Sequence, residues 1–231
     1  MRDSLTVLRK ELREILGDRH SLYGLLVQGG IVFLLTGIVV PAASGPSWDD
    51  VGQITMLYCG FPAAVAAMVA ADAFAGERER RTLETLLATP LDPASIFAGK
   101  VASAAAFSVA VGWLSVIAAI LAAHAKGGLS PLLMPRPEAL LWVGGVGLGY
   151  SLLTATLAVG ISLRLSVARS AQQLAAMLAV GLAVLGSSLL DHGVIRWTTA
   201  LGVPAILLGL AGLAMLVVLS TLRRERWLGL P

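Results

Sequence analysis

Residues 101–123 read VASAAAFSVAVGWLSVIAAILAA, a run that contains no charged side chain. A helix needs about 20 mostly apolar residues to cross the hydrocarbon core of a bilayer, and this run is long enough to do so. Further stretches of similar length and polarity lie on either side of it. Six spans are therefore expected, at about 22–42, 53–71, 101–123, 139–163, 171–190 and 198–221. The sequence predicts an all-α polytopic membrane protein with six transmembrane helices.

The composition of the 231-residue chain agrees with a lipid environment. Hydrophobic residues make up 57% of the chain and charged residues 13%, whereas a soluble protein carries about 25% charged residues. The mean hydropathy is +0.83. The segments between the spans are too short for a second domain, so residues 1–231 are expected to form a single transmembrane domain.

The lysines and arginines indicate the side on which each loop lies, because short cytoplasmic loops retain positive charge. If the N-terminus is cytoplasmic, the outer loops hold three of the 17 basic residues, namely Lys126, Arg136 and Arg196. The cytoplasmic segments then hold the rest, which are Arg2, Arg9, Lys10, Arg13, Arg19, Arg78, Arg80, Arg81, Lys100, Arg164, Arg169, Arg223, Arg224 and Arg226. The sequence predicts a multi-pass protein of the inner (cytoplasmic) membrane with both termini in the cytoplasm.

Residues 4–20 have the pattern of an amphipathic helix. The apolar residues recur at helical spacing on one face, and they are Leu5, Leu8, Leu12, Ile15 and Leu16. Charged residues occupy the other face, so a helix lying in the inner membrane interface is expected. Two roles remain open for this helix: a topological anchor, or a contact with a partner.

The segment 72–100, between the second and third spans, carries the most information about function. Helical propensity is high from Glu77 to Leu87, Pro90 interrupts the helix, and Asp92-Pro93 suits the start of the next one. A cytoplasmic helix-turn-helix is therefore expected here. Its first helix has an apolar face of Leu83, Leu86 and Leu87 within a charged rim. Such a face either seats in the groove of another protein or belongs to a solvated charged helix that packs on its own bundle.

The expected spans lack the residues that several classes of membrane protein need for their function. Transporters driven by ion gradients need ionisable groups near the bilayer midplane, and the six expected spans contain none well inside them. Intramembrane hydrolases need a nucleophile with a base, or paired metal ligands, but His20, His124 and His192 lie on separate loops. No Gly-x-x-x-x-Gly-Lys-Ser/Thr phosphate-binding pattern occurs. Uphill transport would thus draw its energy from another chain.

The small residues within the spans are interpreted as packing residues. The single cysteine, Cys59, lies in an apolar run and is expected to be buried. Gly145 and Gly149 have the spacing of a close helix contact. Ala102, Ala106 and Ala110 either mark a subunit interface or, as such stripes do more often, pack within one bundle.

The run Glu77-x-Glu79-x-x-Thr82-Leu83-Glu84-x-Leu86-Leu87-x-Thr89-Pro90, followed by Gly99-Lys100, resembles the signature loop of ABC-2 type transporter permeases. In that family the loop also lies between the second and third spans. The segment Leu8–Arg19 resembles the connecting helix that opens these permeases. Ser166–Leu174, with its Ala-Gln-Gln, resembles their fifth span and the loop before it. The chain departs from many relatives at Arg81, where they have glycine.

The resemblance implies a permease subunit with no catalytic residue, metal or cofactor of its own. It implies a second permease subunit and an ATP-binding cassette ATPase that binds ATP and Mg, with membrane lipid as surroundings and no nucleic acid partner. The implied ATPase-coupling residues are Glu77, Glu79, Thr82, Leu83, Glu84, Leu86, Leu87 and Pro90. Pro90 would fix the turn that leads back into the third span.

Three functions remain open at this point. The first is the membrane-spanning half of an ATP-driven exporter, the second a permease similar to the haem exporters of cytochrome c maturation, and the third a membrane scaffold or regulator that transports nothing. The substrate, its contact residues and the choice between homodimer and heterodimer cannot be read from the sequence.

Overall fold

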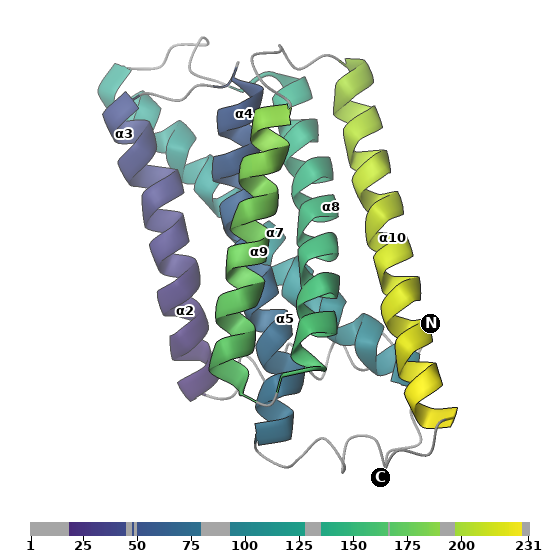
Figure 1. Ribbon diagram of the computed structural model, residues 1–231. Coiled ribbons are helices and arrows are strands. Elements are labelled where there is room, and N and C mark those ends of the chain that lie inside the picture. The colour runs from purple at the N-terminus through teal and green to yellow at the C-terminus, as the bar shows by residue number, and fades with distance from the viewer. Residues whose placement is uncertain are drawn as a thin grey trace.

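The computed structural model describes residues 19–44, 48, 50–79, 93–127, 135–165, 167–189 and 197–227. The described chain forms six helical rods and no strand (Figure 1). The first rod consists of α2 (Arg19–Phe33), the π-helix η1 (Leu34–Val39) and α3 (Val40–Ser44). The second consists of α4 (Val51–Ile54), the π-helix η2 (Thr55–Gly60) and α5 (Phe61–Glu79). The others are α7 (Pro93–Gly127), α8 (Pro137–Ser162), α9 (Ala168–Leu189) and α10 (Trp197–Trp227).

All six rods are long and apolar enough to cross a membrane, which confirms the expected number of spans. Their apolar parts are Leu26–Ser44, Val51–Asp72, Ala94–Ala125, Pro137–Ser162, Ala168–Leu189 and Thr198–Thr221. The expected amphipathic helix over 4–20 lies outside the described residues except for its last two positions, where α2 begins at Arg19.

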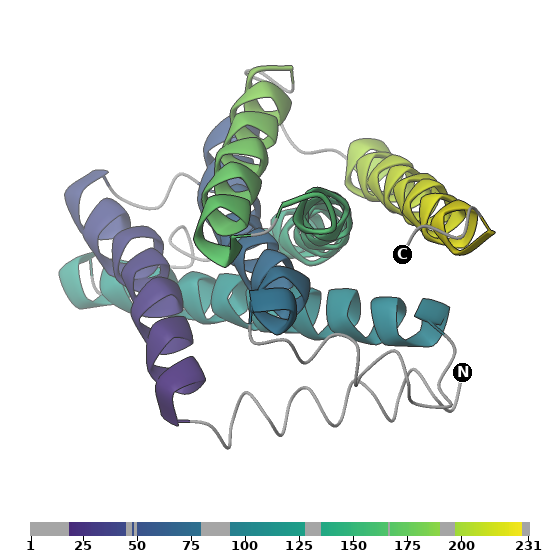
Figure 2. The ribbon, with the colours of Figure 1, turned by 60° about the horizontal axis from the view of Figure 1, so that its bottom comes forward.

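The second rod and α8 form the centre of the bundle. The apolar window of the second rod is 72% buried, whereas those of α9 and α10 are 17% buried. Helix α8 contacts α5, α7, α9, α10 and η2, and Figure 2 shows it with these helices around it. The first rod, α9 and α10 therefore lie at the periphery of a single chain.

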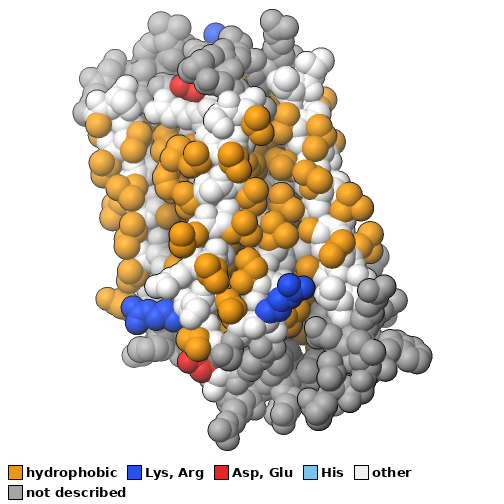
Figure 3. Space-filling view, in the orientation of Figure 1, with side chains coloured by type: hydrophobic (Ala, Val, Ile, Leu, Met, Phe, Trp, Pro, Cys, Tyr) orange, Lys and Arg blue, Asp and Glu red, His pale blue; other side chains and the backbone are white. Residues whose placement is uncertain are grey.

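The surface of the bundle is layered as a membrane requires. On the face drawn in Figure 3, apolar side chains cover the middle band, and blue and red side chains lie toward its two ends. We call these the Glu79 end, at the bottom of Figure 1, where α5 terminates, and the Asp50 end, where α4 begins. Charge is excluded from the middle band because an ion in hydrocarbon loses its hydration.

Helix α7 is longer than the expected third span of 101–123, since it already begins at Pro93 and runs for 35 residues. Such a helix is about 52 Å long, well above the roughly 30 Å hydrocarbon thickness. Figure 1 shows it crossing behind the other helices on a diagonal, which accommodates the extra length. Likewise α5 continues past the expected end of the second span to Glu79. The described flanks of the 72–100 segment are thus extensions of two membrane helices.

The early start of α7 corrects one expectation about charge. Lys100, which was expected in a cytoplasmic loop, lies within α7 and is 2% exposed. The residues before it, including Ile96 and Phe97, are apolar enough to continue the helix into the bundle. Lys100 is six residues from Ala94, or about 9 Å along the helix, so it lies near the Glu79 end and not at the midplane.

Gly145 and Gly149 form the close helix contact that their spacing predicts. A Cβ atom at Gly145 would lie 2.7 Å from Cγ of Pro204, and one at Gly149 would lie 2.7 Å from Cβ of Leu207. Both partners are on α10, so the absence of two side chains lets α10 approach α8. The interpretation of these glycines as packing residues is confirmed.

Of the two alternatives for the alanine stripe on α7, packing within one bundle does not hold for its exposed members, and the subunit interface stays a prediction. Ala102 is half-buried, while Ala106 and Ala110 are exposed. The exposed face continues along α7 through Leu114, Ile117 and Leu121. Sequence spacing correctly groups these residues on one face, but the neighbouring helices cover the opposite face of α7.

We expect Gly149→Ala to destabilise the protein, because the added methyl group overlaps Leu207. Overpacking of this kind costs about 1–3 kcal/mol, and each kcal/mol lowers the Tm by about 2–4 °C for a chain of this size. The measurement is thermal unfolding in detergent. Gly212→Ala on α10 is the control, since its Cβ would meet nothing within 4 Å. Equal Tm values for both variants would contradict the close α8–α10 contact.

Candidate functional site

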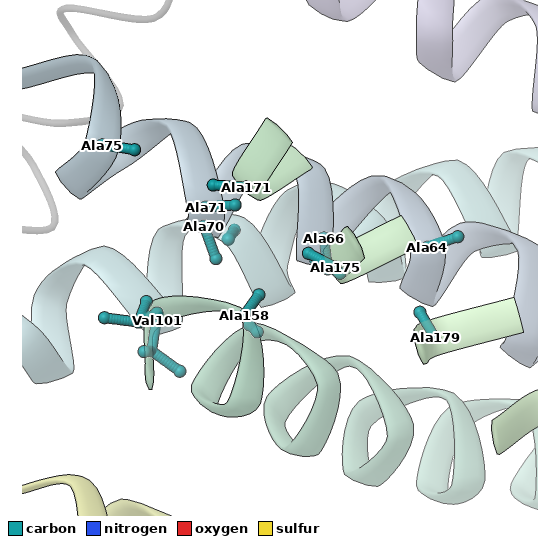
Figure 4. Packing of buried hydrophobic residues seen from close by; sticks show 14 of the residues in the cluster. Ala64, Ala66, Ala70, Ala71, Ala75, Val101, Ala158, Ala171, Ala175 and Ala179 are labelled. Atoms are coloured by element: carbon teal, nitrogen blue, oxygen red, sulfur yellow. The ribbon is translucent and has the colours of Figure 1, made fainter. Parts of the chain in front are cut away.

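The core at the Glu79 end of the bundle is built almost entirely from alanine. All but four members of this cluster, which we call the alanine core, are alanines; the exceptions are Phe97, Val101, Val159 and Val218. Figure 4 shows these alanines on α5, α8 and α9 pointing toward one another. Because a methyl group is the smallest side chain, helix backbones approach closely here.

Helix α9 contributes one alanine per turn to the alanine core. Ala171, Ala175 and Ala179 follow the four-residue spacing that places them on one face, and each is at most 1% exposed. Gln173, Leu174 and neighbouring residues on the opposite face are exposed. The Ala-Gln-Gln sequence therefore divides between the two faces, with its alanine packed in the core.

The two helices that flank residues 80–92 are both anchored in the alanine core. Ala75 near the end of α5 is fully buried, and Phe97 and Val101 in the first turns of α7 are 1% and 3% exposed. All three belong to the same cluster. A displacement of the connecting segment would therefore reach packed helices on both sides.

Helix α5 extends beyond its apolar window, which ends at Asp72. Figure 1 shows its lower end projecting past the neighbouring helices. The carboxylate of Asp72 lies beside Gly76, where a Cβ atom would be 3.0 Å from Oδ1. The last residue, Glu79, is exposed. A helix that begins beside the core and ends in the polar region is suited to carry a displacement into the bundle.

The implied coupling residues fall only partly within the described chain. Glu77 lies in the last turns of α5, and Glu79 ends that helix with its side chain exposed. The remaining ones, Thr82, Leu83, Glu84, Leu86, Leu87 and Pro90, lie outside the described residues. The expected helix starting at Glu77 is therefore, in its described part, the continuation of the second span.

The core at the Asp50 end, which we call the aromatic core, contains the large side chains Trp48, Tyr58, Trp142 and Tyr150. Nε1 of Trp142 donates a hydrogen bond of 2.9 Å to Oγ1 of Thr55. The hydroxyl of Tyr150 donates to the carbonyl of Leu182 at 2.8 Å. The rings of Trp48 and Tyr58 stack with centroids 5.6 Å apart. These contacts tie η2, α8 and α9 together through large side chains.

The sequence interpretation did not identify the aromatic core, although one signal was present. Trp48, Trp142 and Tyr150 lie within or beside apolar runs, and a buried tryptophan or tyrosine usually finds a partner for its polar atom. That rule predicts a hydrogen bond for Trp142, but sequence alone does not identify Thr55 as the acceptor, 87 residues away.

Comparison with known protein families places the chain in one of them. A family model described as ABC-2 family transporter protein matches residues 5–226. The matched range includes the segments at 8–19, 77–100 and 166–174 that carry the sequence resemblance. No curated protein and no solved structure gives a significant match.

We expect Ala171→Leu to destabilise the bundle by about 1–3 kcal/mol, because the alanine core has no room for a larger side chain. The readout is the detergent concentration or temperature at which the purified protein loses helical circular dichroism. Ala110→Leu, on the exposed face of α7, is the control with the same change in volume. An unchanged stability of Ala171→Leu would mean that α9 packs on α5 more loosely than the structure has it.

Proposed function

This chain belongs to the ABC-2 family of transporter proteins, and from this membership we propose that it is the permease subunit of an ATP-driven exporter. In this proposal a separate ATPase subunit hydrolyses ATP, and the chain forms the membrane part of the machine. The absence of a phosphate-binding loop pattern from the sequence supports the division of labour. The transported substrate is not identified.

The observation that carries the proposal is the continuity of α5 between the alanine core and the loop that bears the family motif. Helix α5 runs from Phe61 to Glu79 without a break. Ala66, Ala70 and Ala75 on this helix are fully buried, so the helix is fixed along most of its length. A force applied beyond Glu79 would therefore act directly on the centre of the bundle.

In the proposed mechanism the ATPase contacts residues 77–90 through Leu83, Leu86 and Leu87, with Glu77, Glu79 and Glu84 as a charged rim. Closure of the ATPase on ATP would displace this segment. The ends of α5 and α7 would move with it, because both are packed in the alanine core. Pro90 would end the expected helix over Glu77–Leu87 and keep the connection to Pro93 short.

The proposal also assigns the sides of the membrane, with the Glu79 end in the cytoplasm. Helix α8 follows Arg136 at the Asp50 end and precedes Arg164 at the Glu79 end, and α9 begins next to Arg169. The described charges thus place two exposed arginines at the Glu79 end and one at the Asp50 end. This distribution supports the cytoplasmic assignment on the positive-inside rule.

We expect an ATP-binding cassette ATPase to copurify with the tagged chain in mild detergent and to be lost from Leu86→Asp. A carboxylate on the apolar face would have to be desolvated in the docking groove. Glu84→Arg, which reverses a rim charge, is expected to weaken copurification and to do so more at low salt. The readout is the ATPase-to-permease ratio by quantitative mass spectrometry.

Arg136→Gln is the control for this experiment, since it changes a charge at the opposite end of the bundle. A wild-type chain that captures no ATPase, in membranes from cells that express its full set of partners, would overturn the permease proposal in favour of a scaffold. If Leu86→Asp and Arg136→Gln recover equal amounts of ATPase, the permease proposal stands, but the coupling role of residues 83–87 is contradicted.

The membrane sidedness is testable by cysteine labelling in a Cys59→Ala background, which removes the single native thiol. We expect Arg136→Cys to react with a membrane-impermeant maleimide in intact cells. Arg164→Cys is expected to react only after the cells are permeabilised. The reverse pattern would place the Glu79 end outside and exclude docking of a cytoplasmic ATPase there.

A further inference from the structure

The outward face of α9 changes from polar to apolar along the helix. Its inward face packs on the bundle through alanines, but the apolar window of α9 is only 17% buried. The outward face begins at the Glu79 end with the exposed residues Arg169, Ser170 and Gln173. From there to residue 185 every exposed residue is apolar or glycine, and these are Leu174, Met177, Gly181, Val184 and Leu185. Spacings of three and four residues place them on one side of the helix.

The order of these residues matches the layers of one membrane leaflet. A helix rises 1.5 Å per residue, so Gln173 lies about 6 Å deeper than Arg169. The polar interfacial layer on each side of the hydrocarbon is roughly 5–8 Å thick. The apolar part, from Leu174 to Leu185, extends for about 16 Å more, which is about half of the hydrocarbon thickness. The face therefore presents a charge, an amide and an apolar strip at the depths of a lipid phosphate, its esters and an acyl chain.

The two polar side chains at the start of this face need partners of different kinds. Arg169 is exposed, and a guanidinium remains charged and binds phosphate through several N–H groups. Figure 3 shows basic side chains at the lower edge of the apolar band, where headgroups lie. Gln173 is exposed further inside the apolar window of α9. Its amide has two N–H donors, which lose free energy in hydrocarbon unless an acceptor is present.

We propose that the outward face of α9 binds one anionic phospholipid from the leaflet at the Glu79 end. Arg169 pairs with the phosphate, and the amide of Gln173 donates to an ester carbonyl. One acyl chain lies along the apolar strip, where a Cβ at Gly181 would meet nothing within 4 Å. On the sidedness proposed above this is the cytoplasmic leaflet, but the lipid site itself does not depend on that assignment.

A second copy of the chain suits this face less well than a lipid. Two copies related by a two-fold axis along the membrane normal would place both Arg169 side chains at the same depth, and like charges that face each other oppose association. Close contacts between membrane helices also favour small residues. Here Leu174, Met177 and Leu185 are 48%, 71% and 60% exposed, and such flexible side chains can follow the shape of an acyl chain.

The proposal is tested first by thermal unfolding of the purified full chain in neutral detergent. We expect dioleoyl phosphatidylglycerol to raise the Tm by about 3–6 °C at ten times its Kd. Dioleoyl phosphatidylcholine, which has the same acyl chains and no net charge, is expected to raise it less. Arg169→Gln is expected to weaken binding of phosphatidylglycerol about fivefold and to leave that of phosphatidylcholine unchanged.

Arg164→Gln is the matched control, because Arg164 is also exposed at the Glu79 end but lies before α9. An equal loss of phosphatidylglycerol binding in both variants would replace the site by diffuse attraction between basic residues and anionic lipid. Glycerol phosphate, which has no acyl chain, is expected to leave the Tm unchanged. A rise equal to that with phosphatidylglycerol would mean a site for a free anion and would overturn the lipid proposal.

The position of Gln173 predicts a difference between ester and ether lipids. We expect the wild type to bind diester phosphatidylglycerol more tightly than its diether analogue, which has no carbonyl oxygen. Gln173→Leu is expected to bind the two equally. Equal binding by the wild type would contradict the proposed placement of the lipid. None of these measurements requires the ATPase, so their outcome is separate from that of the permease proposal.

A cross-linking experiment tests the alternative occupant. Met177→Cys in the Cys59→Ala background places one thiol in the middle of the outward face of α9. We expect no disulfide between two copies when native membranes are treated with a mild oxidant. A cross-linked dimer would assign the face to a second copy and overturn the lipid site.

Discussion

Hydrocarbon offers no hydrogen-bonding partner to a peptide group, so each span must satisfy its backbone within the protein. The side-chain hydroxyls follow the same constraint, since Thr36, Thr55 and Ser115 all donate to the carbonyl one turn earlier in their own helix. Each of these hydroxyls is buried, and exposed ones such as Ser187 and Ser220 donate to a carbonyl of their own helix in the same way. The rods and the apolar middle band both follow from this requirement.

The two halves of the bundle are held together by different interactions. The aromatic core at the Asp50 end holds α8 to η2 and α9 through hydrogen bonds of Trp142 and Tyr150. The alanine core at the Glu79 end relies on close backbone approach. The second rod passes through both, and η2 lies in the aromatic half while most of α5 lies in the alanine half. Of the two cores, the alanine core is the one nearer to Glu79.

The number of spans and the role of Gly145 and Gly149 could be predicted because each depends on a local property, such as the length of an apolar run or a four-residue spacing. The direction in which Ala106 and Ala110 face could not, since periodicity groups residues on a face without naming the neighbour that covers it. The expected third span begins too late because a charged side chain normally ends an apolar run, whereas the interior of this protein accommodates Lys100. The close approach of η2 to α7 could not be predicted either, since a Cβ at Gly112 would lie 2.9 Å from the Tyr58 oxygen, a contact between residues far apart in the sequence.

Alanine has no side-chain rotamers, and this gives the alanine core an entropic property that the aromatic core lacks. Ordering an alanine on folding costs no side-chain entropy, whereas larger side chains lose rotamer freedom when they interlock. Where helices meet through methyl groups, a small shift of one helix against the other requires no change of rotamer. Near Trp142 the same shift would strain the indole and its hydrogen bond to Thr55. The two halves of the bundle therefore oppose helix displacement by different means: the alanine core chiefly through close backbone contact, and the aromatic core through side chains that must also keep their rotamers and hydrogen bonds.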